Sequence, residues 1–372
     1  MDMPEIEKGS SREARRRIII RSVGSAAPAA AAALAKGLGL APATVISRIY
    51  RAPAVLVDQV KSITADRMAA LLAELGYEIE IQSMDMAPPE PPVLYDVCLY
   101  VENPARLTHA VVTLARFTGL GESEAFAMIM SPPGMVLGSV SQATIDAFER
   151  QLGEGVELIA SQPELARYHL FLADAPEVIR RRLLDELKVI GIEPRDTVGL
   201  VVADLDYAAA QSLWQRSQSG GFALIVNRDF LRFDVVLQPS GEPPTAAQRE
   251  LLFHVAGIPE DLCGEVFDNA PITLLEAVPS LDLEQKMQEL VAVGLPVKAE
   301  LITFQRLGLR VLSVKDRQGL RRALESFGLH SPGRPLPRAP FRIPGALPAL
   351  QARVLRVALE QNGARVEFDE AA

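Results

Sequence analysis

TGLGESEAFAMIMSPPGMVLGSV, residues 118–140, places a Gly-Leu pair fourteen residues before a proline, from Gly119 to Pro133. The same spacing recurs at two other places in the chain: Gly39 to Pro53 and Gly257 to Pro271. Self-similarity of this kind is typical of a chain built from tandem copies of one unit. Each glycine follows a helical pattern, and a left-handed glycine commonly ends a helix, so we predict a positive φ at all three glycines.

The unit around this stretch has six predicted elements. They are a strand (95–101), a helix (107–120), a short helix (122–130), an extended piece (135–140), a helix (142–152) and a strand (155–159). Pro132 and Pro133 stop the short helix, because proline has no N–H for the helix ladder. Ser141 offers an N-cap for the helix that follows it.

Residues 17–81 follow the same series. Their last helix is predicted over 65–76, and its apolar stripe is Met68, Leu71, Leu72 and Leu75, spaced as one helix face.

Residues 233–302 also keep the series. Asp282 with Gln285 predicts a capping box before the last helix of this stretch.

Two further stretches keep the order in outline. One has a shortened middle, and the other has a middle with five prolines in fifteen residues, which excludes an ordinary second helix there. The predicted fold is therefore α+β, with five tandem units, each ordered strand-helix-helix-strand-helix-strand. The predicted organisation is an N-terminal tail (1–16), repeat 1 (17–85), a proline-rich linker (86–93), repeat 2 (94–161), repeat 3 (167–229), repeat 4 (231–303) and repeat 5 (306–370).

This unit resembles the C-terminal domain of the bacterial ribosomal stalk protein, which is similar in fold to the Clp protease adaptor ClpS. The resemblance is carried best by residues 95–159, through the TGLG turn at 118–121, Glu124-Ala125 and Pro132-Pro133. It implies small α+β domains that bind other proteins. The stalk domain uses lysines around its Gly-Leu turn, whereas ESEAFAMIM contains no lysine, so no site residue is carried over from that family.

Charge is unevenly distributed along the 372 residues. The net charge is −9, yet residues 307–372 hold 11 Lys and Arg against 6 Asp and Glu, a balance of +5, which leaves −14 for the remainder. An acidic body argues against nucleic acid as a main partner.

The expected cellular compartment follows from the lack of a secretion signal and of a membrane-spanning stretch in the sequence. The N-terminal stretch is charged and has no apolar signal core, and prolines interrupt the charge-free run over 125–145, so we expect no membrane span. Two cysteines, Cys98 and Cys263, fit a reducing cytoplasm, where each is expected to be a buried core residue. The Arg and Ala bias favours a bacterial cytoplasmic protein.

No motif for catalysis stands out. The chain has no phosphate-binding loop, no nucleophile elbow and no HExxH, and its four histidines lie apart in sequence. We therefore expect no enzyme activity, no cofactor and no metal. Trp214, the only tryptophan, is the first binding anchor to consider if it is exposed.

These patterns predict a non-enzymatic scaffold or adaptor that binds other proteins, as a subunit of a larger cytoplasmic assembly. Arg334, Arg338 and Arg342 recur every four residues in a stiff proline-rich segment, and we expect them to bind an acidic surface of a partner or of another copy of this chain. A solvated loop is the alternative for that segment. Two other functions remain open: an enzyme or cofactor-binding protein with a site at a domain junction, and a proteolysis adaptor or translation-associated factor.

Overall fold

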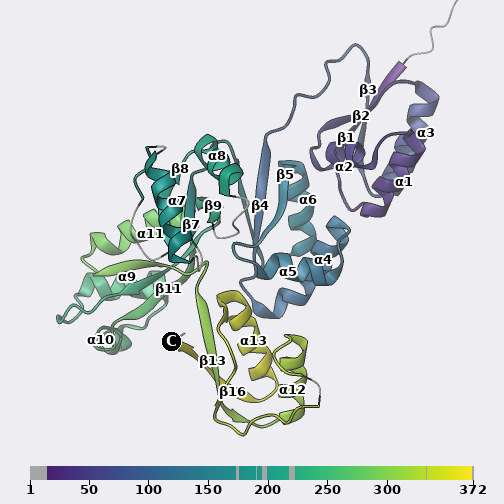
Figure 1. Ribbon diagram of the computed structural model, residues 1–372. Coiled ribbons are helices and arrows are strands. Elements are labelled where there is room, and N and C mark those ends of the chain that lie inside the picture. Colours follow the sequence, from purple (N-terminus) through teal and green to yellow (C-terminus); the bar gives the residue numbers. More distant parts are fainter. Residues whose placement is uncertain are drawn as a thin grey trace, which may run out of the picture. The chain divides into compact units, whose positions relative to one another are not determined.

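The computed structural model describes residues 15–172, 176–189, 191–194, 199–217, 223–331 and 333–370. It shows an α+β protein with five separate small antiparallel sheets (Figure 1). The chain divides into two compact units: Met1–Val97 with Thr108–Phe126 and Val136–Ala160, and Cys98–Leu107 with Ala127–Met135 and Ser161–Ala372. Repeat 1 lies in the first unit, repeats 3, 4 and 5 lie in the second, and repeat 2 contributes to both.

Repeats 1 and 2 have the element order that the sequence predicts. Repeat 1 contains β1 (Arg15–Ser22), α1 (Pro28–Leu38), α2 (Pro42–Tyr50), β2 (Ala54–Lys61), α3 (Ser62–Glu74) and β3 (Glu78–Ser83). Repeat 2 contains β4 (Leu94–Tyr100), the 3-10 turn η1 (Pro104–Arg106), α4 (Leu107–Thr118), α5 (Glu122–Met130), β5 (Met135–Ser141), α6 (Gln142–Leu152) and β6 (Glu157–Ser161).

Repeats 3 and 4 differ in their middle parts. Repeat 3 contains β7 (Tyr168–Leu172), α7 (Glu177–Val189), β8 (Leu200–Leu205), α8 (Tyr207–Ser217) and β9 (Ala223–Asn227), so its described residues keep the predicted middle strand, β8, but include no second helix between α7 and β8. After the turn η2 (Arg228–Phe230), repeat 4 contains β10 (Arg232–Leu237), α9 (Ala246–Ala256), η3 (Glu260–Leu262), α10 (Cys263–Asp268), β11 (Ile272–Pro279), α11 (Ser280–Ala292) and β12 (Val297–Leu301).

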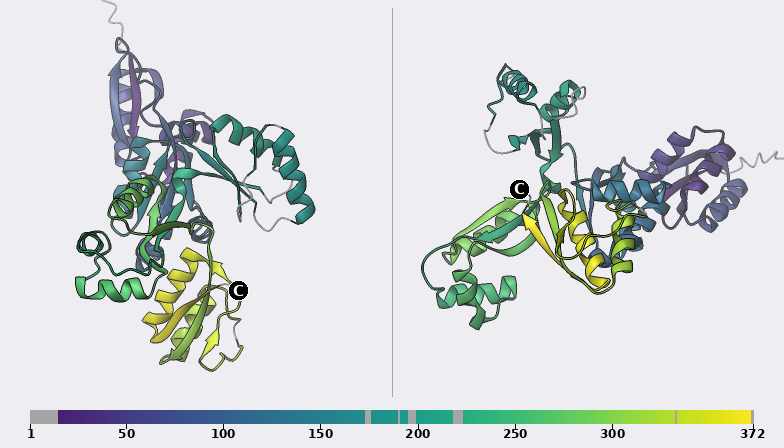
Figure 2. Two further views of the ribbon diagram at one scale, coloured as in Figure 1. Left: turned by 90° about the vertical axis from the view of Figure 1, so that its left-hand side faces the viewer. Right: turned by 60° about the horizontal axis from the view of Figure 1, so that its bottom comes forward.

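Repeat 5 closes the described chain. It contains β13 (Arg306–Val314), α12 (Arg317–Ser326), β14 (Phe341–Arg342), β15 (Leu347–Pro348), α13 (Ala349–Gln361) and β16 (Ala364–Glu370). Its two helices lie on one face of its sheet (Figure 2). As the prolines predict, no helix forms over 327–348 in the described residues of that stretch.

The first strand of every repeat lies at the centre of its sheet. The strand orders are β2-β1-β3, β5-β4-β6, β8-β7-β9 and β11-β10-β12. In repeat 5, β14 and β15 share one edge of β13 and β16 takes the other, since Arg310 pairs with both Arg342 and Glu367. Ile18, Ile19 and Ile20 of β1 are fully buried although successive side chains point to opposite faces of the sheet, so both faces of β1 are covered; α2 and α3 of repeat 1 and α6 of repeat 2 contact this strand.

The three glycines that define the repeat spacing adopt the predicted backbone geometry. Gly39, Gly119 and Gly257 have φ values of 66°, 80° and 65° and follow the ends of α1, α4 and α9. The peptide bonds before Pro53, Pro133 and Pro271 are also alike, since all three are cis, as is the bond before Pro340 in repeat 5.

A β-bulge opposite the central strand recurs in repeats 1, 3 and 4. At each bulge, one residue of the central strand faces two residues of the neighbouring strand. That central residue lies between Arg16 and Ile18 in repeat 1, between Tyr168 and Leu170 in repeat 3, and between Phe233 and Val235 in repeat 4. The bulged strands carry left-handed residues other than glycine: Gln59, Asp204 and Ala277, with Ser139 at the matching place in β5. Each left-handed residue costs about 1 kcal/mol, so its recurrence calls for a compensating contact.

A side chain of the central strand supplies that contact. Asp96 accepts the N–H of Ser139 at 3.0 Å, and Asp234 accepts the N–H of Ala277 at 2.8 Å. In repeat 3 the acceptor is His169 Nδ1, 3.2 Å from the N–H of Asp204.

Repeat 1 has a cation, Arg17, at the same place. A guanidinium cannot accept a hydrogen bond, and here it pairs with Asp58 at 3.3 Å. Asp58 in turn accepts the N–H of Gln59 at 3.0 Å. In repeat 1 the acceptor is therefore a residue of the bulge itself, whereas in repeats 2, 3 and 4 it is a residue of the central strand.

Two local predictions are wrong. The capping box expected at Asp282 lies instead at Thr245 and Gln248, before α9, because α11 already begins at Ser280 and Asp282 falls within its first turn. The apolar stripe of α3 is only partly buried: Leu72 lies in the core, whereas Leu71 is 60% exposed and Leu75 is 46% exposed.

Repeat 1 packs against part of repeat 2 within the first unit. The hydroxyl of Tyr50 donates to the carbonyl of Phe117 at 2.5 Å, and the two rings meet edge to face at 5.7 Å. Thr144 donates its hydroxyl to the carbonyl of Tyr50 at 2.9 Å. The linker over 86–93 therefore joins two repeats that also contact each other directly.

Substitution by alanine should have different effects on stability at the three glycines that define the repeat spacing. An added Cβ at Gly119 would lie 3.0 Å from Pro28 Cβ, whereas nothing lies within 4 Å at Gly39 or Gly257. We expect Gly39→Ala and Gly257→Ala to cost about 1 kcal/mol for the left-handed φ, and Gly119→Ala to cost more. Chemical denaturation measures each difference. Gly264→Ala, in the helix α10 with an ordinary φ and open space, is the control and should be neutral or stabilising.

Alkaline pH should lower the unfolding free energy of the first unit. Burial, with a further contribution from Tyr77, raises the pKa of Tyr50 from 10.0 to about 12, and burial raises the pKa of Tyr77 to about 12. Both pKa values are higher in the folded state, so the stability they contribute is complete below pH 10 and is lost as the pH rises toward 12. We expect Tyr50→Phe to show a shallower fall in unfolding free energy over this window. Identical slopes for the variant and the wild type would contradict it.

Candidate functional site

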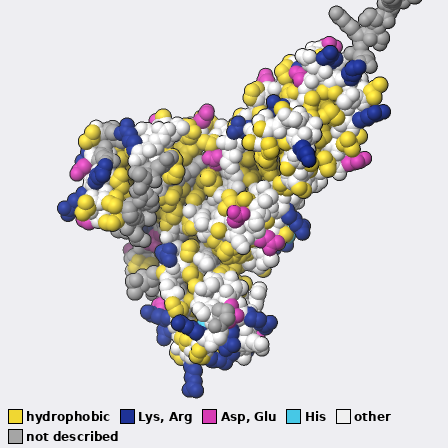
Figure 3. All heavy atoms as spheres, turned by 45° about the vertical axis from the view of Figure 1, so that its right-hand side comes forward, with side chains coloured by type: hydrophobic (Ala, Val, Ile, Leu, Met, Phe, Trp, Pro, Cys, Tyr) yellow, Lys and Arg dark blue, Asp and Glu magenta, His cyan; other side chains and the backbone are white. Residues whose placement is uncertain are grey.

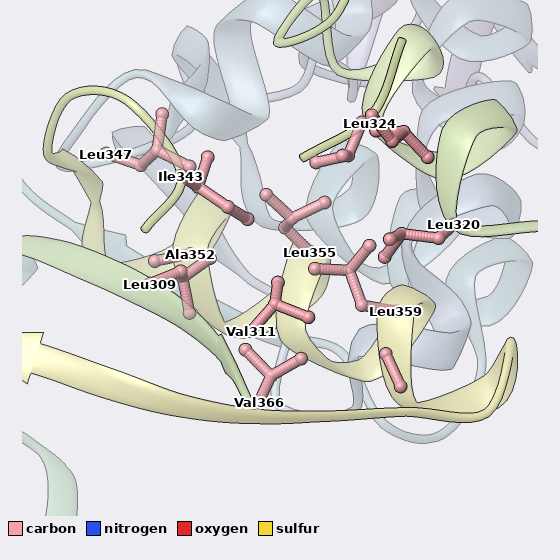
Figure 4. Packing of buried hydrophobic residues seen from close by; sticks show 12 residues of the cluster. Leu309, Val311, Leu320, Leu324, Ile343, Leu347, Ala352, Leu355, Leu359 and Val366 are labelled. Atoms are coloured by element: carbon pink, nitrogen blue, oxygen red, sulfur yellow. The ribbon is translucent and has the colours of Figure 1, made fainter. Parts of the chain in front are cut away.

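The proline-rich segment of repeat 5 is held in its own repeat by apolar anchors. Leu336, Ile343 and Leu347 are buried in the same cluster as residues of α12, α13 and β16. Figure 4 shows Ile343 and Leu347 directed toward Leu355 of α13. The segment is thus part of the core of repeat 5 along much of its length.

Polar contacts fix the same segment on the surface. The Arg317 guanidinium donates to the carbonyls of Leu336 at 2.8 Å and of Pro337 at 3.3 Å. The ring of His330 lies 2.9 Å from the carbonyl of Arg334. These bonds place Arg334 and Arg338 on either side of the point where Arg317, at the start of α12, contacts the segment.

The three predicted arginines do not form one row. Arg334 and Arg338 are exposed and lie outside regular structure, whereas Arg342 belongs to β14 and pairs opposite Arg310 of β13. Arg342 Nε lies 2.5 Å from a carboxylate oxygen of Asp369. A cation already matched in this way has less to offer a partner than Arg334 and Arg338.

Helix α12 adds cations that the sequence analysis did not select. Arg321 lies one turn, about 6 Å, beyond Arg317, and Arg322 follows it; both are exposed. We name Arg317, Arg321, Arg322, Arg334 and Arg338 the basic face. Lys and Arg side chains gather at the lower end of the view in Figure 3, where repeat 5 lies. The only sequence signal for these additional cations was the Arg321-Arg322 pair. That pair does not reveal that α12 contacts the proline-rich segment.

Trp214, the predicted anchor, is 48% exposed on α8 of repeat 3. Beside the same helix, an apolar groove of about 640 Å³ is lined by Leu170, Leu183, Leu213 and other residues of repeat 3, with Arg182, Asp185 and Arg216 also contributing. Trp214 is not among the residues that line this groove.

Repeat 4 presents a second hollow. Ala246, Arg249, Glu250, Phe253, Pro259 and Glu260 line a groove of about 500 Å³. Phe253 is 57% exposed there, and Arg249 lies 3.8 Å from the carboxylate of Glu260.

Ionisable groups converge at one place within the second unit. The guanidinium of Arg232 lies 3.7 Å from the ring centre of Tyr100, and Arg353 donates to the Tyr100 hydroxyl at 3.3 Å. Arg353 also lies 4.0 Å from both Asp234 and Glu276. Burial raises the pKa of Asp234, against the opposing effects of the Ala277 N–H and Arg353.

The cavity at this convergence is small. It has a volume of about 50 Å³ and is lined in part by Tyr100, Arg232 and Arg353. A space of this size holds a few water molecules rather than a substrate. Its charged groups are matched to one another, which is the pattern of a structural contact between repeats.

Cysteine and histidine side chains occupy structural places. Cys98 and Cys263 are both buried, as the sequence predicts, and burial raises the pKa of the Cys263 thiol. His169 is the bulge acceptor of repeat 3 described above. Within the described ranges, no group of three or more His, Cys, Asp or Glu side chains is arranged to hold a metal ion. Of the helices in that part of the chain, none has the length and apolar character that crossing a bilayer requires.

Comparison with known proteins gives no family: no family model, no curated protein and no solved structure matches this chain.

Leu336 should decide whether the basic segment keeps its shape. Replacing it with alanine removes a buried side chain from the core of repeat 5, and we expect a loss of about 2 kcal/mol of unfolding free energy. The segment should also become a substrate for trypsin at Arg338. Denaturation and timed proteolysis measure the two effects. Arg338→Lys, which retains a trypsin site, is the control; equal cleavage of Leu336→Ala and this control would contradict the anchoring role of Leu336.

Proposed function

We propose that this chain is a non-enzymatic scaffold or adaptor that binds other proteins within a larger cytoplasmic assembly. The observation that carries the proposal is that the repeats share one sheet arrangement but present surfaces of different chemistry. Exposed large apolar side chains occur on the helices of repeats 1, 3 and 4: Ile46, Ile63, Leu71, Val178, Trp214, Phe253, Leu281 and Val291. No such side chain occurs among the described residues of repeat 5, which presents the basic face instead.

Such a division of surfaces suits a chain with several neighbours. Apolar helix faces favour partners with apolar patches, whereas a basic face favours an acidic partner. Repeats joined in one chain also raise the effective concentration of the second partner once the first is bound. The contact of Tyr50 with Phe117 supports a fixed spacing of repeats 1 and 2 within the first unit, and the contact of Arg353 with Asp234 does so for repeats 4 and 5 within the second unit.

The fold that we propose for each unit is that of the ribosomal stalk C-terminal domain and of ClpS. The central first strand, the recurrent Gly-Leu turn and the helices gathered on one face in repeat 5 support this assignment. Both relatives act by binding proteins, which agrees with a scaffold. A role in proteolysis or translation rests on that resemblance alone.

An enzyme or cofactor site at a junction between repeats has less support. The cations at the one convergent cluster described, Arg232 and Arg353, are matched by Tyr100, Asp234 and Glu276. Substrate recognition there would first have to break these contacts.

Different surfaces should hold different partners. The full chain, tagged and captured from native extract, is compared with two variants: Leu71→Ser with Leu75→Ser in repeat 1, and Phe253→Ser with Leu262→Ser in repeat 4. Because all four side chains are exposed, folding should be retained, and each pair should remove its own subset of co-purified proteins in quantitative mass spectrometry. Ser131→Ala, an exposed position in repeat 2 and outside both substituted repeats, is the control.

The scaffold proposal fails if both variants retain every partner that the wild type retains. It also fails if the purified chain carries a stoichiometric small molecule and no protein.

A further inference from the structure

The two C-terminal repeats carry opposite charge. Repeat 5 (306–370) has 12 Lys and Arg against 6 Asp and Glu, a balance of +6. Repeat 4 (231–303) has 4 against 12, a balance of −8. Charged side chains stay in water unless they are paired, so this difference in charge between repeats 4 and 5 is a difference between their surfaces.

The basic face of repeat 5 is exposed and largely unmatched. Among the described residues, no carboxylate forms an ion pair with Arg321, Arg322, Arg334 or Arg338. The cations of repeat 5 that do have partners lie elsewhere: Arg310 pairs with Glu367, Arg342 with Asp369, and Arg356 with Glu360. The unmatched set is therefore concentrated on α12 and on the adjacent segment.

Repeat 4 carries an acidic helix face of comparable length. Asp261, Glu265 and Asp268 are exposed and spaced i, i+4, i+7 along the continuous turn of η3 and α10, so they lie on one side of it. The other side of the helix is fixed in the core through Cys263. Among the described residues, no Lys or Arg lies within ion-pair distance of these three carboxylates; Arg249 pairs with Glu260 beside them. We name Asp261, Glu265 and Asp268 the acidic face.

We propose that the basic face of repeat 5 binds the acidic face of repeat 4 in a second copy of this chain. The basic face, formed by α12 and the adjacent proline-rich segment, and the acidic face, formed by η3 and α10, carry opposite charge and so meet the requirement of electrostatic complementarity. The contact joins different surfaces of the two copies, so it is heterologous. Unless the rotation between copies closes a ring, such contacts extend into open chains.

Nucleic acid fits the basic face less well. The chain as a whole is at −9, and repeat 4 would repel a polyanion bound nearby. Single-stranded nucleic acids also stack on exposed aromatic side chains, and the described residues of repeat 5 expose no large apolar or aromatic side chain.

Charge reversal with mixing tests the proposal. Each variant is named after the face that it alters. The basic variant carries Arg321→Glu, Arg334→Glu and Arg338→Glu in the basic face. The acidic variant carries Asp261→Lys, Glu265→Lys and Asp268→Lys in the acidic face. Sedimentation velocity over a concentration series measures association of the full chain. We expect the wild type to associate at low salt, each variant alone to associate at least about tenfold more weakly, and an equal mixture of the two to recover association, because each supplies the charge that the other lacks. Raising the salt to ~1 M, where the Debye length falls to about 3 Å, should weaken the wild-type association.

Matched controls separate this surface from charge in general. Arg342→Ser removes a cation that is already paired, and Asp282→Lys reverses an exposed carboxylate on α11; both should associate like the wild type. Circular dichroism and thermal unfolding confirm that each variant is folded.

The proposal is overturned if the wild type stays monomeric at low salt, if both reversed variants associate unchanged, or if the mixture fails to recover association. Binding of duplex DNA by a monomeric wild type, lost in the basic variant, would also overturn it and assign the face to nucleic acid. Since only the purified chain is used, the result is independent of whether the scaffold proposal holds.

Discussion

The β-bulge opposite the central strand is the constraint on which repeats 1 to 4 depend. A left-handed residue other than glycine is costly, and it recurs at Gln59, Ser139, Asp204 and Ala277. In repeats 2, 3 and 4 its N–H is accepted by a side chain of the central strand, which is a carboxylate in repeats 2 and 4 and an imidazole in repeat 3. In repeat 1 the replacement of the acceptor by Arg17 is accompanied by Asp58 in the bulge. The bulge is therefore preserved by the contact rather than by one residue type.

Once this strand pairing is fixed, the remaining elements are free to differ. Repeats 1, 2 and 4 keep a second helix, whereas repeat 5 replaces it with a proline-rich segment that still delivers apolar side chains to the core. That substitution places arginines on the outside and Leu336 on the inside of the same short stretch. A repeat can thus change the chemistry of its surface without losing its sheet.

Contacts between repeats combine apolar packing with matched polar groups. Tyr50 packs on Phe117 and donates a hydrogen bond to its carbonyl, and Arg353 contacts Tyr100 and Asp234. Leaving one partner of such a buried set unmatched costs more than the pair contributes, so these contacts restrict how the repeats meet.

The sequence by itself determined the repeated architecture, the left-handed glycines and the absence of a helix in the proline-rich stretch, because spacing and proline chemistry are local properties. It also placed Cys98 and Cys263 in the core. Only the tertiary structure decided that Arg342 is paired with Asp369, that α12 contributes Arg321 and Arg322 to the same surface as Arg334, and that Leu71 faces solvent. Those outcomes depend on residues distant in the chain, whose approach is set by how each helix packs on its sheet and leaves no mark in the local pattern.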